Sequence, residues 1–219
     1  MKVIACVLKS GTWKNRHIKV EYCGDHVRWL RDQISNNLRT NHRFVCLSDL
    51  DINGVDVIKL QDDLPGWFSK IELFREFNEA FYIDLDTVIT GDITRMVKHS
   101  HKFTVLRNLS SKNSGKIGSG VMAWGGDYSI IYKKFMENPQ KYVNEYVTPE
   151  KWGDQSFIQD VLRDHAGWDH FQDLFPGRIV SYKFDLYRRD PKPDNRIVCF
   201  HGEPKPWQTK HKWVPPLHG

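Results

Sequence analysis

The first ninety residues alternate short apolar runs with amphipathic segments, and this alternation constrains the fold most. Four apolar runs have the length of buried strands: residues 3–8, 43–47, 55–60 and 79–83. Two segments between them carry apolar side chains at helical spacing: residues 25–39 and 67–78. Strands that alternate with helices are typical of an α/β layer with a parallel sheet. We therefore predict an α/β fold, Rossmann-like, with helices flanking a mostly parallel central sheet.

After Gly91, the alternation of apolar runs with amphipathic segments is less regular. Four later strands are predicted over residues 103–106, 120–124, 176–182 and 197–201, and two helices over 126–137 and 152–164. Residues 108–118 are polar and rich in Ser, Lys and Gly, which predicts a loop. No internal repeat or linker divides the chain. We predict a single domain over residues 1–219, with a basic, aromatic C-terminal tail from about residue 203.

Charge and cysteine content narrow the classes of protein. The chain of 219 residues has a net charge of +5, and residues 187–219 carry seven basic against three acidic side chains. Such a tail can meet phosphates or acidic headgroups, or it can be a solvated end. The four cysteines lack CxxC spacing, which is typical of free thiols in a reducing compartment. No apolar run suits a signal peptide or a membrane span, so we expect a soluble, cytoplasmic protein.

Two carboxylates follow the apolar run that ends in Phe81-Tyr82-Ile83. Asp84 and Asp86 stand one residue apart, at the end of a strand where ligands bind in open α/β sheets. Buried charges are costly unless something pairs with them, and paired carboxylates suit a hard cation such as Mg²⁺ or Mn²⁺. A solvated turn carrying two acids is the other interpretation.

A second candidate site lies in the stretch CFHGEPKPW, residues 199–207. His201 ends a predicted strand and can ligate Mn²⁺ through a ring nitrogen, although a histidine there is more often structural. Gly202 allows close approach of the backbone to a ligand. Lys205 lies between two prolines and could contact a diphosphate as a point charge.

Four stretches in order carry a resemblance: FYIDLDTVI, IGSGVMAW, WGDQSFI and FHGEPKPW. Together they resemble the nucleotide-sugar glycosyltransferases of the GT-A fold, most closely family 8 and small bacterial and viral relatives. The resemblance runs from the first strand to Trp207. It implies a metal-dependent transfer of sugar from a nucleotide sugar, with UDP as the expected nucleotide and Mn²⁺ (or Mg²⁺) as the cofactor.

The resemblance also implies roles for particular residues. The implied metal ligands are Asp84, Asp86 and His201. The implied catalytic pair beside the reacting sugar is Asp154 and Gln155. The implied donor-binding residues are Val7, Lys9, Ser10, Ser48, Asp49, Lys70, Asp84, Leu85, Ser119, Gly120, Gly202 and Lys205. The chain departs from family 8 in having Gly118 where Asn is usual, Lys70 where Arg is frequent, and His201 directly next to Gly202.

The tryptophans have two interpretations. Trp67, Trp124 and Trp152 occupy apolar positions typical of a core, although one of them could pack against a sugar face. Trp207 and Trp213 belong to the basic tail, where aromatic rings could stack on bases or sugars of an acceptor. Alternatively, the tail folds back across the domain.

Several functions remain open at this stage. The acceptor could be a hydroxymethylated DNA base, which the basic tail slightly favours, or a cell-surface or lipid-linked saccharide. A sugar nucleotidyltransferase usually carries a Gly-rich basic loop after its first strand, and Lys9-Ser10-Gly11-Thr12 is a faint version. A non-catalytic module that binds nucleotide sugars or nucleic acids is the third class.

Overall fold

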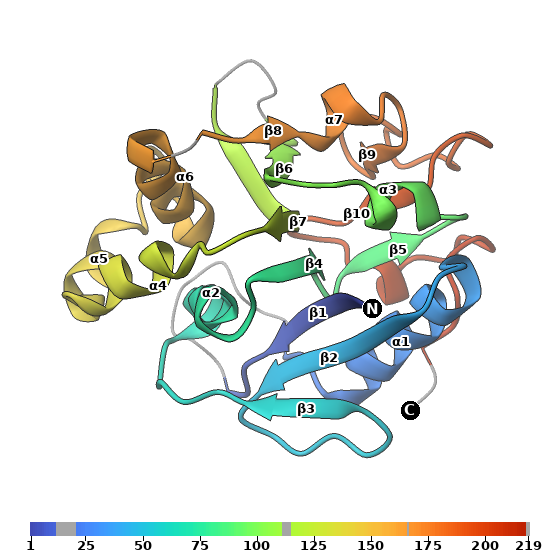
Figure 1. Ribbon diagram of the computed structural model, residues 1–219. Helices are drawn as coiled ribbons and strands as arrows, with labels where there is room; N and C mark the ends of the chain where they lie inside the picture. The colour runs from blue at the N-terminus through green and yellow to red at the C-terminus, as the bar shows by residue number, and fades with distance from the viewer. Residues whose placement is uncertain (12–20, 111–114, 166, 218–219) are drawn as a thin grey trace.

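The computed structural model of the chain describes residues 1–11, 21–110, 115–165 and 167–217. The predicted loop over residues 108–118 falls partly outside these ranges, and Thr12 of the Lys9-Ser10-Gly11-Thr12 stretch lies outside them. Within them, helices lie on both sides of a central sheet (Figure 1).

The elements of the first half follow the predicted alternation. In chain order they are β1 (Lys2–Leu8), α1 (Gly24–Asn37), β2 (His42–Ser48), β3 (Asp56–Lys59), the 3₁₀ helix η1 (Gly66–Glu72), α2 (Leu73–Glu76) and β4 (Glu79–Ile83). The predicted helix over 67–78 is therefore mostly a 3₁₀ helix that ends in one α-turn. Its start is set by Pro65 and by Gly66, whose φ of 53° favours glycine.

The second half contains shorter elements. They are β5 (Thr87–Ile89), α3 (Thr94–Lys98), β6 (Phe103–Arg107), β7 (Ile117–Gly125), α4 (Ser129–Met136), α5 (Pro139–Glu145), α6 (Gly153–His165), β8 (Asp169–His170), α7 (Phe171–Leu174), β9 (Ile179–Ser181), β10 (Ile197–Cys199) and the 3₁₀ helix η2 (Pro206–Gln208). Six of these were not predicted: β5, α3, α5, β8, α7 and η2. All six have seven residues or fewer, too few for a clear period in the sequence.

The seven-stranded sheet has the order β3-β2-β1-β4-β7-β6-β8. Strands β3, β2, β1 and β4 are parallel, whereas β7 pairs antiparallel with both β4 and β6. The prediction of a mostly parallel central sheet is confirmed. Because β7 is reversed, its N-terminal end lies at the same edge as the carboxyl ends of β1 and β4. The ends of three strands therefore meet at one place.

Alternate side chains of β1 build the core on the two faces of the sheet. Ile4, Cys6 and Leu8 pack with α1, α3 and α7 on one face. Ala5 packs on the other face with η1, α2, α4 and α6. Buried apolar surface on both faces explains why the strands read as continuous apolar runs in the sequence.

A second sheet of three strands, β5-β10-β9, joins segments from distant parts of the chain. Strand β5 begins directly after Asp86, and β10 ends directly before Phe200 and His201. Thr87 pairs with Cys199, so this sheet holds the two segments side by side. The pairing brings the two predicted metal-binding motifs together.

The C-terminal tail packs against the domain. Trp207, Trp213 and Leu217 lie on a buried cluster that includes Trp29 of α1 and Phe200. Trp29 also donates a hydrogen bond from its indole nitrogen to the Pro215 carbonyl, at 3.0 Å. The folded-back arrangement is therefore observed, and both tryptophans of the tail are half-buried.

All four cysteines are free thiols, and Cys23 is the exposed one. Within the described ranges, no helix has the length and apolar character needed to cross a bilayer.

Candidate active site

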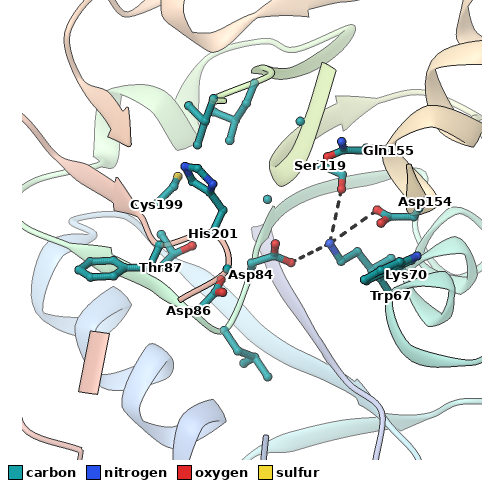
Figure 2. Close-up of a pocket in the computed structure, with 18 of the residues that line it drawn as sticks. Trp67, Lys70, Asp84, Asp86, Thr87, Ser119, Asp154, Gln155, Cys199 and His201 are labelled. Atoms are coloured by element: carbon teal, nitrogen blue, oxygen red, sulfur yellow. Dashed lines mark hydrogen bonds and ion pairs between the residues drawn. The ribbon is translucent and has the colours of Figure 1, made fainter. Parts of the chain in front are cut away.

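A cavity of about 610 Å³ opens where β1, β4 and β7 end, and it is the principal pocket of the described residues. Its wall combines the first turn of α6, the 3₁₀ helix η1 and the loop after β10 (Figure 2). Pockets at the carboxyl ends of strands in open α/β sheets are the usual ligand sites of such folds.

Asp84 lies in the middle of the cavity wall. Its backbone N–H donates to the Gly120 carbonyl at 2.8 Å, which continues the pairing of β4 with β7 beyond the end of β4. A Cβ atom on Gly120 would lie 3.2 Å from Oδ2 of Asp84, so the small residue leaves room for the carboxylate. Burial raises the pKa of Asp84, and the ammonium of Lys70 opposes that shift.

Lys70 connects three predicted site residues (Figure 2). Its Nζ lies 2.9 Å from Oδ1 of Asp84, 3.6 Å from Oδ2 of Asp154 and 3.5 Å from Oγ of Ser119. Burial alone would lower the pKa of Lys70, but Asp154 and Asp84 raise it above its usual value. The lysine therefore stays charged and holds the two aspartates on either side of it.

Asp154 stands in the first turn of α6, directly after Gly153. Gly153 has a φ of 64°, and a Cβ atom there would lie 2.8 Å from the indole nitrogen of Trp67. Asp154 is only 4% exposed, and its Oδ2 has no hydrogen bond to the described residues. Gln155 follows it on the cavity wall. A buried carboxylate oxygen without a hydrogen bond can accept one from a ligand hydroxyl.

Asp86 lies on the opposite side of Asp84 from Lys70. Its Oδ2 pairs with the ammonium of Lys205 and accepts a hydrogen bond from the Tyr22 hydroxyl at 3.1 Å. Lys205 also lies 5.6 Å from the centre of the Tyr22 ring. The predicted diphosphate contact, Lys205, is thus bound to a carboxylate in this structure.

His201 lines the same side of the cavity. One ring nitrogen, Nε2, forms a 2.7 Å hydrogen bond with the Ser181 hydroxyl, and the ring stacks on Phe184 at 5.4 Å between centroids. Burial, reinforced by the neighbouring Lys183, lowers the pKa of His201 to about 4. The imidazole is therefore neutral at pH 7 and keeps a lone pair for a ligand.

The three predicted metal ligands have suitable chemistry for a shared ion, but in the part of the chain that the structure describes their placement does not form a metal site. Carboxylate oxygens and a neutral imidazole are donors that Mn²⁺ accepts, so the chemistry of Asp84, Asp86 and His201 fits. However, no group of three or more His, Cys, Asp or Glu side chains is placed to hold a metal within the described residues. An ion held by Asp86 would meet a carboxylate whose Oδ2 already binds Lys205 and the Tyr22 hydroxyl.

Among the residues predicted to bind the nucleoside, some line the cavity and others do not. Val7 and Lys9 line the cavity. Ser10 and Asp49 lie next to them and bind each other, because Asp49 accepts hydrogen bonds from the backbone and hydroxyl of Ser10 at 2.9 and 2.6 Å. Ser48 is fully buried, and its hydroxyl accepts a hydrogen bond from the Leu50 backbone. The structure does not bring Ser48 to the cavity.

Most of the predicted site residues meet at this one cavity. Those that line it are Val7, Lys9, Lys70, Asp84, Leu85, Asp86, Ser119, Gly120, Asp154, Gln155, His201, Gly202 and Lys205. Sequence reasoning missed Lys183 and Phe184, which line the cavity from the loop after β9, and Tyr22, which precedes α1. These three residues lie outside the four stretches that carry the family resemblance, so no pattern in the sequence singled them out.

Among the central tryptophans, two of the three belong to the cavity. Trp67 and Trp152 line it and pack against each other, with ring centroids 5.5 Å apart. Trp124 is 1% exposed and donates to the Phe77 carbonyl at 2.9 Å. The core interpretation holds fully for Trp124, and the interpretation of a ring near the ligand fits the other two.

Solved glycosyltransferases share this fold. The apo form of GlyE from Streptococcus pneumoniae TIGR4 matches with a TM-score of 0.62 and 14% identity, over 94% of this chain and 56% of GlyE. The galactosyltransferase LgtC, solved with donor and acceptor sugar analogs, matches with a TM-score of 0.62 and 12% identity, over 97% of this chain and 90% of LgtC. The bifunctional WbbM gives 0.55 and 11%, over 94% of this chain and 46% of WbbM.

These likenesses show that the chain has the GT-A-like fold of glycosyltransferases, as its resemblance predicted. This chain spans little more than half the length of GlyE but nearly all of LgtC. No protein-family model and no curated protein sequence matches the chain. At such low identity, the activity has to be argued from the cavity itself.

Proposed function

We propose that this protein is a glycosyltransferase that moves a sugar from a UDP-sugar to a hydroxyl of an acceptor. The observation that carries the proposal is the convergence of Asp84, Asp86, Asp154 and His201 on one cavity. These residues come from segments far apart in the chain, and a binding module has no need for two aspartates around one buried lysine. We also propose one domain over residues 1–219 and a cytoplasmic location, which the free thiols favour.

The donor would lie along the cavity from β1 to α6. Val7 and Lys9 would contact the nucleoside, while Ser10 and Asp49 would fix the loop that carries them. The diphosphate would lie near Asp86 and His201, where Mn²⁺ or Mg²⁺ would be held. When bound, such an ion would act as a Lewis acid on the diphosphate.

The sugar would then face Lys70, Asp154 and Gln155. Oδ2 of Asp154, which accepts no hydrogen bond from the described residues, would accept one from a sugar hydroxyl, and the carboxylate would stabilise positive charge at the reacting carbon. Lys70 forms an ion pair with Asp154 and orients its carboxylate. Trp67 and Trp152 would exclude water from this end of the cavity. We propose retention of configuration, with the departing phosphate as the base.

The acceptor that we propose is a saccharide, free or lipid-linked. Phe184 is 45% exposed at the cavity edge, and aromatic rings in such places stack on the apolar faces of sugars. LgtC, the neighbour solved with an acceptor sugar analog, supports the same class of acceptor.

A hydroxymethylated DNA base is the second candidate acceptor. The observation in its favour is the group of exposed cations in the C-terminal segment: Arg188, Arg189, Lys192, Lys210 and Lys212. The tail tryptophans do not support it, since they pack on the domain. DNA binding that weakens steeply with salt would support this acceptor, and binding that is absent or insensitive to salt would exclude it.

UDP release from a panel of UDP-sugars tests the proposal, with Mn²⁺ or with EDTA. Release that depends on Mn²⁺, occurs with one sugar and is lost in Asp86→Asn would support it. Asp56→Asn, which removes an exposed carboxylate on β3, is the matched control. Pyrophosphate release would instead identify a nucleotidyltransferase. No UDP binding under either condition would contradict the proposed donor.

A further inference from the structure

The lysines of the cavity differ in their partners. Four lysines line its described wall: Lys9, Lys70, Lys183 and Lys205. Three of them form ion pairs with at least one aspartate. Lys183 alone has neither a hydrogen bond nor an ion pair with the described residues, although it is half-buried. A cation in such a place is costly unless an anion compensates it.

The surroundings of Lys183 are more cationic than anionic. Burial lowers the pKa of Lys183, and the positive charges of Arg188 and Lys205 lower it further, against the opposing effect of Glu203 and Asp86. Asp86 is already bound to Lys205. The protein therefore supplies positive charge at this point of the cavity without supplying a matching negative charge.

Gly202 provides the space for this arrangement. Its φ is 67°, and a Cβ atom there would lie only 3.1 Å from Nζ of Lys183. Without that side chain, the ammonium reaches the backbone next to His201. The ammonium of Lys183 lies on the side of the cavity that holds Asp86. The proposed function places the diphosphate on that side.

We propose that Lys183 binds the diphosphate of the donor and stabilises the leaving nucleoside diphosphate, an inference that rests on the proposed function. In the transfer, the bond between the anomeric carbon and the diphosphate oxygen breaks, and its electron pair stays on that oxygen. The acceptor oxygen forms the new bond to carbon, and its proton passes to the departing diphosphate. Lys183 remains an ammonium throughout and lowers the energy of the growing negative charge.

This role gives the chain a source of positive charge that needs no metal. Lys205 already shares its charge and one of its N–H donors with Asp86, whereas the ammonium of Lys183 has no ion pair with the described residues. We expect UDP to bind with measurable affinity in EDTA, and Lys183 to account for that residual affinity.

Calorimetric titration with UDP, UMP and inorganic diphosphate tests the role of Lys183. Each probe is titrated into the full chain, in EDTA and in Mn²⁺. Lys183→Gln should weaken UDP and diphosphate binding in EDTA about tenfold or more, as expected for a lost charge-assisted hydrogen bond. UMP, which lacks the second phosphate, should bind both proteins alike. Lys183→Arg should keep most of the affinity.

Lys192→Gln, at an exposed lysine of the same segment, is the matched control and should change nothing. Equal UDP and diphosphate affinities for wild type and Lys183→Gln, in folded protein with an unchanged melting temperature, would overturn the role of Lys183 alone. A wild-type protein that binds neither probe in either buffer would overturn the proposed donor site together with it.

Discussion

The buried carboxylates and histidines at the cavity differ from those away from it in how completely their polar atoms are hydrogen-bonded. Away from the cavity, Glu72 is fully buried, and its two oxygens accept from Gln61 N, Asp62 N and Arg75. At the cavity, Oδ2 of Asp154 accepts no hydrogen bond from the described residues. Both carboxylates are buried near a cation, so neither burial nor a neighbouring positive charge distinguishes Asp154 from Glu72.

The histidines repeat the contrast. Burial lowers the pKa of both His101 and His201 to about 4. Nε2 of His101 donates to the Met96 carbonyl at 2.9 Å, and Nδ1 bonds the Thr104 hydroxyl at 2.8 Å. His201 bonds only Ser181 within the described chain. Similar pKa shifts therefore accompany burial in both places, and the cavity is distinguished by the Asp154 oxygen that accepts no hydrogen bond from the described residues.

The largest expected effect comes from Asp154→Asn. We expect UDP release from the donor to fall about 100-fold or more, because the charge facing the sugar is lost. The free energy of unfolding should fall by about 1 to 2 kcal/mol, because the variant loses the ion pair with Lys70 while Lys70 keeps its contact with Asp84. Urea unfolding and steady-state UDP release measure the two quantities.

Asp160→Asn on the same helix is the control for that variant. Its carboxylate already binds the Tyr146 hydroxyl at 2.8 Å, so stability should fall and activity should persist. If Asp154→Asn kept wild-type activity, the lack of a hydrogen bond at Oδ2 of Asp154 would have no functional meaning.

Glu72→Ala should show the opposite pattern. It leaves the Gln61 and Asp62 backbone N–H groups without an acceptor and opens a void in the interior. We expect the free energy of unfolding to fall by about 3 kcal/mol, measured by urea denaturation. UDP affinity at a temperature where the variant is folded should match wild type. A loss below about 1 kcal/mol would mean that this network is not structural.

Gly153→Ala tests the backbone that presents Asp154. The φ of 64° strains any side chain, and the added Cβ would meet the Trp67 indole. We expect the free energy of unfolding to fall by about 2 kcal/mol. The affinity for a UDP-sugar should fall more than the affinity for UDP. Gly167→Ala has a similar φ of 64° but meets nothing within 4 Å, so it separates backbone strain from the clash.

The smallest effect concerns His101 and acid. Its folded pKa of about 4 lies below the unfolded value of 6.5, so its stabilising contribution is complete above pH 6.5. It is lost as the pH falls from 6.5 towards 4, because the unfolded chain binds the proton first. We expect a loss of about 1 kcal/mol from this group in its half-buried site. Urea unfolding at several pH values should show a shallower decline for His101→Gln.

The sequence predicted the central sheet well because its strands are apolar and buried on both faces. It also brought Asp84, Asp86, Asp154 and His201 to one site, through motifs that resemble a family. It could not show that Lys205 pairs with Asp86, or that Lys70 lies between two aspartates, because such pairs depend on distances across the fold. Lys183 and Phe184 were missed since the short strand β9 gives their loop no recognisable pattern.

The three-stranded sheet has a consequence for the order in which the molecule is built. Strand β5 leaves the ribosome before β6, β7, β8 and β9, but its hydrogen-bonding partner β10 follows all four of them in the sequence. Pairing has to wait until β10 is synthesised, and closing so long a loop is slow. The large sheet can form first, whereas the diphosphate side of the cavity is completed last. Catalytic competence should therefore appear after most of the secondary structure during refolding.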